Sequence, residues 1–354
     1  MPHRTELTLG APLSDQPLPV AGEAPDAPAR PRRWRGTLAS YATVVFFLLT
    51  LNFFLPRAMP GEPIAGLSDA GSATYVSEDT TRAAVERYYG LDRSLVDQYT
   101  GYLGGLARGD LGTSIHYNAP VSRVIGDRIG WTLLLVGTGL AFATALGMLG
   151  GVLSGWRRGR PLDRGLLGVF LAVDTFPVFF VASAAAYVLS VKLGWFPLSG
   201  ARTPFADSYG PVRQVADVAY HLALPATVLA LQFLTYQFLV MRSSMVGELG
   251  SDYLLLGRAK GLSDRVLKYR YAARNALLPS VTVAGLQMGF AITAAIFVES
   301  VFAYPGLGQL MFGAVAERDY PVMQGCFLVL TLIVISANLV ADLAYRRLDP
   351  RIAR

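Results

Sequence analysis

The sequence predicts an all-α integral membrane protein with six transmembrane helices. Of its 354 residues, 53% are hydrophobic and only 16% are charged, whereas a soluble domain carries about 25% charged residues. Six apolar stretches approach or exceed the length of about 20 residues that a helix needs to cross the hydrocarbon core of a bilayer. The predicted spans are Thr37–Leu55, Trp131–Trp156, Leu166–Val191, Tyr220–Met241, Ser280–Phe302 and Val322–Tyr345.

The segment before the first span differs in composition from the rest of the chain. Residues 1–36 are rich in proline and alanine and show no apolar periodicity, which predicts a disordered cytoplasmic tail that ends in the basic run RPRRWR. The following stretch, residues 37–55, is long and directly follows this tail. We therefore expect it to be a membrane anchor rather than a cleaved signal.

Basic residues gather in alternate connections between the predicted spans. Residues 57–130 hold seven Arg and no Lys against nine Asp or Glu. The connections after spans two and four, like the flanks of spans one and six, are instead rich in Arg, which is typical of cytoplasmic segments. This alternation predicts six spans with both termini in the cytoplasm, including a C-terminal tail of residues 346–354. In these cytoplasmic segments, apart from the loop after span four, the arginines are Arg30, Arg32, Arg33, Arg35, Arg157, Arg158, Arg160, Arg164, Arg346, Arg347, Arg351 and Arg354.

In a soluble protein, the net charge of +6 would indicate nucleic-acid binding. In a membrane protein, the excess of arginine in the cytoplasmic segments explains this charge. The single cysteine, Cys326, lies in an apolar run and has no partner for an internal disulfide. The three histidines are far apart in the sequence and lack the spacing of metal ligands. We therefore expect neither a metal centre nor a bound cofactor in this chain.

The connection between spans one and two, residues 56–130, is long enough to fold on the outer face. The stretch SEDTTRAAVERYYGL has Ser77 as a candidate N-cap and Gly90 after its last turn. A second helix is predicted from Ser94 to Ala107, because its apolar residues recur at helical spacing. This small helical module either docks a partner or gates an entrance, or it is a packed cap that only shields the spans.

The connection between spans four and five, residues 242–279, contains the basic stretch DYLLLGRAKGLSDRVLKYRYAARNALLP. The helical pattern of span four continues through Leu249 and Leu256 and stops at Gly261. A glycine just after a helix whose last turn carries Arg258 and Lys260 is typical of a helix C-terminus. The sequence therefore predicts that the helix of span four extends to a glycine corner.

A second, short helix is predicted beyond that corner. Ser263 is its candidate N-cap, and Leu262 and Leu267 occupy the two positions of a hydrophobic staple. This helix runs to about Asn275, and Pro279 opens span five. Such an element either transmits a displacement by a bound protein to the transmembrane helices, or it lies as an amphipathic basic helix on anionic lipid.

The stretch AKGLSDRVLKYRYAARNALLP resembles the cytoplasmic loop of peptide-importing ABC transporter permeases. In that family the loop is the variant EAA motif, whose short coupling helix fits into a cleft of the ATPase subunit. The resemblance extends over nearly the whole chain beyond the tail. The other matching stretches are PGEP (60–63), YGLDRSLVDQYTGYLGGLARGDLGTS (89–114), GWFPLSG (194–200), RSSM (242–245), VESVFAYPGLGQL (298–310), RDYPVMQG (318–325) and NLVADLAYRRLDPR (338–351).

The resemblance implies a type I ABC importer permease fold, with spans two to six (131–345) as its core, in a bacterial or archaeal cytoplasmic membrane. It implies one half of a pore that works with a second permease, two ATP-binding subunits that hold ATP-Mg, and an extracytoplasmic substrate-binding protein. The substrate class is di- or oligopeptides, with nickel chelates, glutathione or oligosaccharides as alternatives. The implied ATPase-coupling residues are Ala259, Lys260, Gly261, Leu262, Ser263, Arg265, Arg274 and Asn275.

The sequence departs from the family pattern in two places. The first three positions of the generic EAA consensus read Leu255, Leu256 and Gly257 here, so the acidic contact is absent. Asp174, just before TFPVF, is a carboxylate where the family more often has a small or apolar residue. These departures concern the details of the ATPase contact and of the pathway.

Three carboxylates lie inside predicted spans: Asp174, Glu299 and Asp342. Charges in hydrocarbon are expensive, so each either faces a wet pathway or is hydrogen-bonded to a neighbouring helix. We take Asp174 and Glu299 as candidates for the translocation pathway. An ion-coupled secondary transporter would use such groups as relays, and it is the rival function that they favour.

The sequence lacks the motifs of an enzyme. It contains no GxxxxGK[ST] phosphate loop, so ATP hydrolysis is expected in partner subunits. It also contains no HExxH and no GxSxG, which argues against an intramembrane protease or lipase. We therefore expect a non-catalytic membrane subunit.

Overall fold

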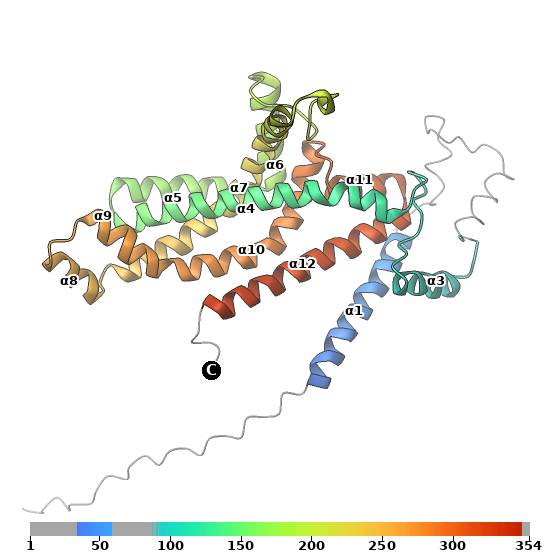
Figure 1. Cartoon of the computed structure of the whole chain (residues 1–354), viewed down its shortest axis with the longest axis horizontal. Helices are drawn as coiled ribbons and strands as arrows, with labels where there is room; N and C mark the ends of the chain where they lie inside the picture. The colour runs from blue at the N-terminus through green and yellow to red at the C-terminus, as the bar shows by residue number, and fades with distance from the viewer. Residues whose placement is uncertain (1–33, 59–86, 88–89, 91, 349–354) are drawn as a thin grey trace, which may run out of the picture. The chain divides into compact units, whose positions relative to one another are not determined.

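The computed structural model describes residues 34–58, 87, 90 and 92–348, and among them the side chains of residues 34–42, 44 and 341–348 are not described (Figure 1). The chain divides into two compact units, residues 1–47 and 48–354. The first unit contributes the beginning of helix α1, and all contacts discussed below lie within the second. Most of the predicted tails and of the stretch SEDTTRAAVERYYGL lie outside the described residues, but residues 34–36 of the first tail and 346–348 of the second are helical.

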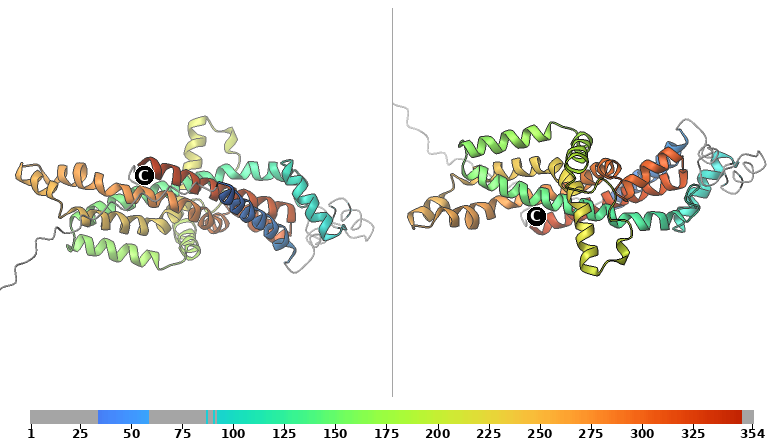
Figure 2. Two further views of the ribbon diagram at one scale, coloured as in Figure 1. Left: turned by 90° about the horizontal axis from the view of Figure 1, so that it is seen from below. Right: turned by 90° about the horizontal axis from the view of Figure 1, so that it is seen from above.

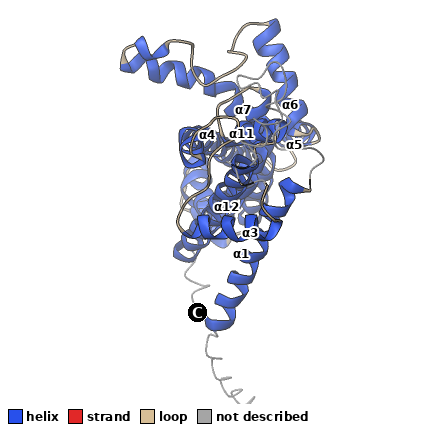
Figure 3. Ribbon diagram, turned by 90° about the vertical axis from the view of Figure 1, so that its right-hand side faces the viewer, coloured by secondary structure: helices blue, strands red, loops and turns tan. Residues whose placement is uncertain are grey.

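The described part of the chain is helical, and Figure 3 draws no strand in it. Its helices follow in chain order. They are α1 (Trp34–Arg57), α3 (Leu95–Ala107), α4 (Val121–Trp156), α5 (Pro161–Asp174), α6 (Val178–Ala185), η2 (Ala186–Lys192), η3 (Ala206–Ser208), α7 (Pro211–Glu248), α8 (Asp252–Ala259), α9 (Asp264–Val266), η4 (Leu267–Ala272), α10 (Ala273–Val301), α11 (Leu307–Glu317) and α12 (Tyr320–Leu348).

Four described helices are long and apolar enough to cross a membrane. They are α4, α7, the continuous helix Asp264–Val301 and the part Tyr320–Val340 of α12. The bent pair of α5 with α6 and η2 makes a fifth if its two halves form one span. In α1, the described apolar part is the shorter stretch Val45–Arg57, so the described residues support four to five of the six predicted spans.

The third predicted span, Leu166–Val191, is bent in the structure. Its two halves, Pro161–Asp174 and Val178–Lys192, meet at an angle of 97°. Pro177 lies at the break with an extended ψ of 143°. Proline lacks the backbone N–H that a helix needs and disfavours helical geometry in the residue before it, which here is Phe176. The sequence therefore breaks this span in the middle.

The connection between spans four and five also differs from the prediction. Helix α7 ends at Glu248 and does not continue to the glycine corner, because a turn at residues 249–251 separates it from α8. The short helix after the corner does not end near Asn275. It continues through a π-helical stretch, η4, into α10, so that Pro279 lies inside a helix. Packing of the buried Ala272, Ala273 and Ala276 favours this continuous helix.

Glycines on one face of α4 allow it to pack directly against α7 (Figure 2). A Cβ atom added to Gly151 would lie 2.6 Å from the Cβ of Met241, and one added to Gly155 would lie 2.6 Å from the Cβ of Met245. Such contacts are shorter than side chains tolerate, and small residues are typical of helices that approach this closely in membranes. Helices α10 and α12 complete the main apolar core around this pair.

A second apolar cluster lies where the ends of α4 and α7 meet α8 and η4. Its fully buried members include Met241, Met245, Leu254 and Leu267. Figure 1 shows α8 and α9 at the same end of the helices as the connection between α4 and α5. The two basic connections of residues 157–160 and 252–263 therefore lie at one end, as the alternation of charge predicts.

The predicted second outer helix is present as α3. Ser94 is its N-cap, and the Ser94 hydroxyl accepts a hydrogen bond from the backbone N–H of Asp97 over 3.2 Å. The helix ends at Ala107, as its apolar spacing predicts.

Candidate functional site

The glycine corner between α8 and α9 has the geometry of a Schellman motif. Gly261 adopts a left-handed φ of 76°. Its N–H donates to the carbonyl of Arg258 over 2.9 Å, and the N–H of Leu262 donates to the carbonyl of Gly257 over 3.1 Å. These two bonds satisfy the carbonyls that a helix end leaves free. The predicted corner is confirmed, and it reverses the chain within a few residues.

The helix after the corner begins where the sequence predicts. Ser263 has the extended backbone of an N-cap, with φ −66° and ψ 149°, but its side chain makes no capping hydrogen bond. The N–H of Leu267 donates to the Ser263 carbonyl over 3.0 Å. The Ser263 hydroxyl is exposed rather than used for the cap.

A close contact fixes α8 against η4. A Cβ atom added to Gly257 would lie 2.5 Å from Cδ2 of Leu267 and 3.5 Å from Cδ1 of Leu262. Leu267 and Leu254 are both fully buried. A larger side chain at this position would meet the end of the Leu267 side chain, so the small size of Gly257 lets α8 pack closely on the second apolar cluster.

All eight predicted coupling residues are exposed. Among them, Lys260 and Arg265 put positive charge on the corner. Apolar side chains are exposed beside them, with 58% of Leu255 and 56% of Leu256 accessible to solvent. The two leucines that replace the acidic part of the consensus therefore form an apolar patch next to the cationic corner.

Helix α8 is also tied to the end of α7. The Tyr253 hydroxyl forms a short hydrogen bond with the carboxylate of Glu248. Burial raises the pKa of the Tyr253 phenol, and the neighbouring Glu248 carboxylate raises this pKa further. The turn between α7 and α8 is thus bridged by a side-chain contact.

A buried ion pair joins α5 to α7, in residues that the sequence analysis did not single out as a pair. Asp163, 2% exposed, accepts hydrogen bonds from Nε and Nη2 of Arg242 over 2.7 and 2.8 Å. It also accepts from the Ser154 hydroxyl and, over 2.8 Å, from the N–H of Gly159. Four donors from α4, α7 and the connection after α4 therefore meet on one carboxylate. Arg242 opens the RSSM stretch, but that stretch alone does not identify its partner.

Asp174 is exposed at the end of α5, directly before the break in the third span. No hydrogen bond or ion pair of its side chain to another described residue is present. An apolar hollow with a volume of about 490 Å³ adjoins this break. Among the residues that line it are Val173, Phe176 and Phe180. The carboxylate is thus free to meet a ligand or a partner chain, and its role in the pathway stays a prediction.

The Glu299 side chain is fully buried. Each of its hydrogen-bond partners in the described part of the chain is a protein group. It accepts hydrogen bonds from the Thr132 hydroxyl over 2.7 Å and from the N–H groups of Gly308 and Gln309 over 2.6 and 3.3 Å. Thr132 in turn accepts from the N–H of Leu307 over 2.8 Å. These bonds join α10 to α4 and to the start of α11, which favours the interhelical alternative for Glu299. The structure does not describe the side chain of Asp342.

Residues 147–354 match the protein family described as "Binding-protein-dependent transport system inner membrane component". The whole chain resembles curated proteins as well. A Brucella suis biovar 1 protein described as a peptide permease is 40% identical over 319 residues, which cover 90% of this chain and 95% of that one. The "Di/tripeptide transport system permease protein DppB" of Pseudomonas aeruginosa is 35% identical over 324 residues, covering 87% and 94% of the two chains.

The "Oligopeptide transport system permease protein AppB" of Bacillus subtilis is 34% identical over 319 residues, covering 90% of this chain and 98% of that one. Among solved structures, a chain of the MetNI methionine ABC transporter in inward-facing conformations matches with a TM-score of 0.52 at 15% identity. The match covers 64% of this chain and 96% of that chain, and at this identity it shows the fold alone.

Proposed function

Because the chain belongs to the family of inner membrane components of binding-protein-dependent transport systems, we propose that it is the permease subunit of an ATP-driven importer of di- or oligopeptides. The observation that carries this proposal is the identity of 34–40% over about nine-tenths of the chain with proteins named as peptide permeases. The chain is a non-catalytic component of the transport system. ATP-Mg binds to the partner subunits.

In this proposal the chain crosses the bacterial inner membrane six times in the type I importer fold, with both termini in the cytoplasm. It forms half of the translocation pathway, and a second permease forms the other half. Two ATP-binding subunits drive the transporter from the cytoplasm, and an extracytoplasmic binding protein delivers the substrate. Selectivity then depends largely on that binding protein, which is a different chain.

The exposed corner of residues 252–275 is the proposed contact with an ATP-binding subunit. Closure of the ATP-binding subunits displaces this corner, and three rigid features pass the displacement on. The Schellman turn at Gly261 fixes α8 relative to α9, the Gly257–Leu267 contact fixes α8 on η4, and η4 continues directly into α10. A displacement of the corner therefore moves the span formed by α10.

The apolar patch of Leu255 and Leu256 beside the cationic corner is compatible with lipid as well as with protein. Two observations favour protein. The corner is held by specific backbone bonds and by a close glycine contact. A helix that only rests on lipid has no need of such fixed geometry.

The test is transport in proteoliposomes that hold the complete complex with its binding protein. Uptake of a labelled tripeptide is expected to require ATP and to persist when ionophores collapse all ion gradients. Uptake that follows an imposed ion gradient without ATP would instead establish the ion-coupled carrier. A catalytically dead ATP-binding subunit is the control, since it leaves the permease unchanged.

A further inference from the structure

Four exposed arginines gather where α4 turns into α5, and neither the proposed coupling contact nor the pathway uses them. In the described part of the chain, none of their guanidinium groups forms a hydrogen bond or an ion pair with another residue. Four positive charges within eight residues are therefore exposed without a protein partner. These residues, here called the hairpin arginines, are Arg157, Arg158, Arg160 and Arg164.

The one acidic residue among them does not neutralise their charge. Asp163 is only 2% exposed. Its carboxylate accepts two hydrogen bonds from the guanidinium of Arg242, and two more from the Ser154 hydroxyl and the N–H of Gly159. Because α7 supplies the cation that balances Asp163, all four charges of the hairpin arginines stay unbalanced.

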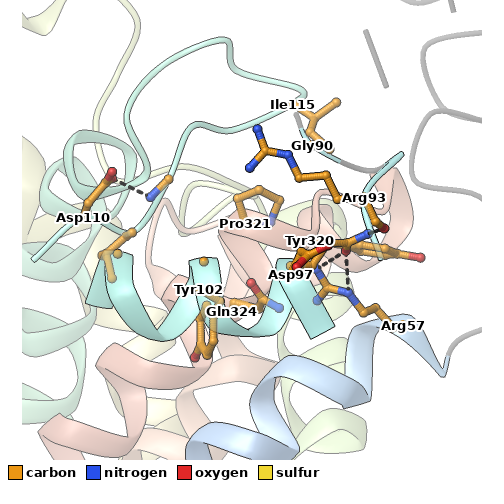
Figure 4. Close-up of a pocket in the computed structure, with 15 residues that line it drawn as sticks. Arg57, Gly90, Arg93, Asp97, Tyr102, Asp110, Ile115, Tyr320, Pro321 and Gln324 are labelled. Carbon is orange, nitrogen blue, oxygen red and sulfur yellow. Dashed lines mark hydrogen bonds between the residues drawn. The ribbon is translucent and has the colours of Figure 1, made fainter. Parts of the chain in front are cut away.

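The outer pocket between α1, α3 and α12 shows the opposite balance of charge (Figure 4). Among the residues that line it, Arg57 and Arg93 are matched in number by Asp97 and Asp110. The guanidinium of Arg57 also donates to Oε1 of Gln98 over 2.9 Å. The signs of charge cancel at this pocket, whereas the hairpin arginines form an excess of one sign.

The sequence of α4 places the hairpin arginines at the depth of lipid headgroups. Residues 129–156 contain no charged side chain. At the helical rise of 1.5 Å per residue they extend about 42 Å, which is close to the thickness of a bilayer with its headgroups. Trp131 and Trp156 lie near the two ends of this stretch, where aromatic residues mark membrane interfaces. Arg157 follows Trp156 directly.

The turn between the two helices holds the hairpin arginines in place. Gly159 adopts a left-handed φ of 78°, and its N–H donates to the buried carboxylate of Asp163 over 2.8 Å. The N–H of Arg160 donates to the carbonyl of Arg157 over 3.0 Å. The backbone of the turn is therefore ordered while the arginine side chains stay exposed. Such pre-organisation lowers the entropy cost of binding.

The position of the turn favours lipid over a protein from the aqueous side. Figures 1 and 2 show α8 and α9 extending past the turn between α4 and α5 at the same end of the long helices. A protein that approaches this end meets α8 and α9 first, and the hairpin arginines lie nearer to the spans. Leu162, in the first turn of α5, is 38% exposed, and an exposed leucine beside arginines is compatible with the boundary between headgroups and acyl chains.

We propose that the hairpin arginines bind the phosphodiester groups of anionic phospholipids at the end of α4 and α5 that the positive-inside rule assigns to the cytoplasm. A guanidinium presents paired N–H donors that match phosphate oxygens. Basic residues at this depth also gain from the negative potential of an anionic leaflet. The inference concerns the lipid around the permease, and it does not depend on the identity of the transported substrate.

Binding is measured by fluorescence quenching, with the full-length chain reconstituted in phosphatidylcholine bilayers. The chain retains Trp156 as its only tryptophan, and the other three are replaced by phenylalanine. The bilayer contains either phosphatidylglycerol or phosphatidylcholine with brominated acyl chains, which quench a nearby tryptophan. At equal mole fractions, the relative quenching gives the preference for the anionic lipid beside the hairpin arginines. With the four arginines intact, this preference is expected to be about tenfold or more.

Replacing all four hairpin arginines by glutamine is expected to abolish the preference without lowering the unfolding temperature, since their side chains have no partner in the described chain. Replacing all four by lysine keeps the charge and is expected to retain most of it. Arg123→Gln is the matched control, because Arg123 is exposed at the opposite end of α4. With the arginines intact, added salt is expected to lower the preference by screening, which requires no further variant.

The inference is overturned if the chain with intact arginines is quenched equally by both brominated lipids, or if salt leaves a preference unchanged. It is also overturned if Arg123→Gln lowers the preference as much as the fourfold glutamine variant does. A glutamine variant that keeps the lipid preference, but no longer copurifies with the ATP-binding subunits, would assign the hairpin arginines to a protein contact instead.

Discussion

Asp163 and Arg242, 79 residues apart in the sequence, form a two-point ion pair in which Nε and Nη2 of the arginine donate to the two oxygens of one carboxylate over 2.7 and 2.8 Å. The pair joins the start of α5 to α7. Because Ser154 and Gly159 also donate to Asp163, the carboxylate fixes the connection between α4 and α5 as well. This network is the most heavily bonded polar group at that end of the described helices.

Breaking this ion pair is expected to destabilise the chain. Arg242→Gln leaves the buried Asp163 without its cation, and an uncompensated buried charge costs about 3–5 kcal/mol. The double variant Asp163→Asn/Arg242→Gln is expected to lose less than the sum of the two single changes, because it leaves no charge unpaired. Thermal unfolding in detergent measures this, with Asp127→Asn, an exposed residue of α4, as control. Additive losses would show that the two residues act independently.

The backbone conformation of Gly261 predicts which substitutions the corner tolerates. Gly261→Val is expected to insert normally and to lose substrate-stimulated ATPase activity in the assembled complex, because a β-branched residue is strained at φ 76° by about 1–2 kcal/mol. A Cβ there meets no atom within 4 Å, so the effect is one of backbone conformation. Gly261→Asn, which tolerates the left-handed region, is expected to retain most of the stimulation. Full stimulation of ATPase activity in the Gly261→Val variant would show that the corner has no role in coupling.

The contact between Gly257 and Leu267 is expected to show compensation. Gly257→Ala places a methyl group 2.5 Å from the buried Cδ2 of Leu267, so either the Leu267 side chain or α8 must move, and coupling is expected to fall. Shortening the partner in Gly257→Ala/Leu267→Val is expected to restore part of the ATPase stimulation. Gly250→Ala, where a Cβ meets nothing within 4 Å, is the control. If the double variant is no better than Gly257→Ala alone, the contact does not determine the position of α8.

Membrane orientation is testable with single introduced cysteines in a variant without the buried Cys326. A membrane-impermeant thiol reagent added to intact cells is expected to modify cysteine at Ser94 or Ser208 and not at Ser263, because the positive-inside rule places the corner in the cytoplasm. Labelling of Ser263 after the membrane is permeabilised shows that the site is accessible. Labelling of Ser263 in intact cells would reverse the orientation.

Asp174 is expected to influence substrate charge. Its exposed carboxylate lies at the break of the third span beside an apolar hollow, so it attracts the positive groups of a peptide where water reaches it. Asp174→Asn is expected to lower the uptake of cationic peptides several-fold more than that of neutral ones, measured per folded complex. Asp207→Asn, another exposed aspartate, is the control. Equal losses for both substrates would remove Asp174 from the pathway.

Local signals in the sequence identified several features that the structure contains. Ser94 caps α3, Gly261 closes the Schellman turn, and Ser263 begins the next helix, because each depends on the backbone conformation and on hydrogen bonds within a few residues. Long apolar runs also located membrane-spanning helices. The thickness of the bilayer sets the length of such a helix independently of its neighbours. The arginine clusters of residues 157–160 and 252–263 lie at one end of the helices, as predicted.

Tertiary structure alone decided the rest. The helical pattern of α7 runs past Glu248, yet the helix ends there, because packing of Leu254 and Leu267 on the second apolar cluster requires α8 to turn. Packing between helices that are far apart in the chain pairs Arg242 with Asp163. The same packing leaves the amide nitrogen of Gln324 without an acceptor among the described residues. Composition and periodicity do not encode such pairs, because the energy of a hydrogen bond or ion pair depends on atoms that only helix packing brings together.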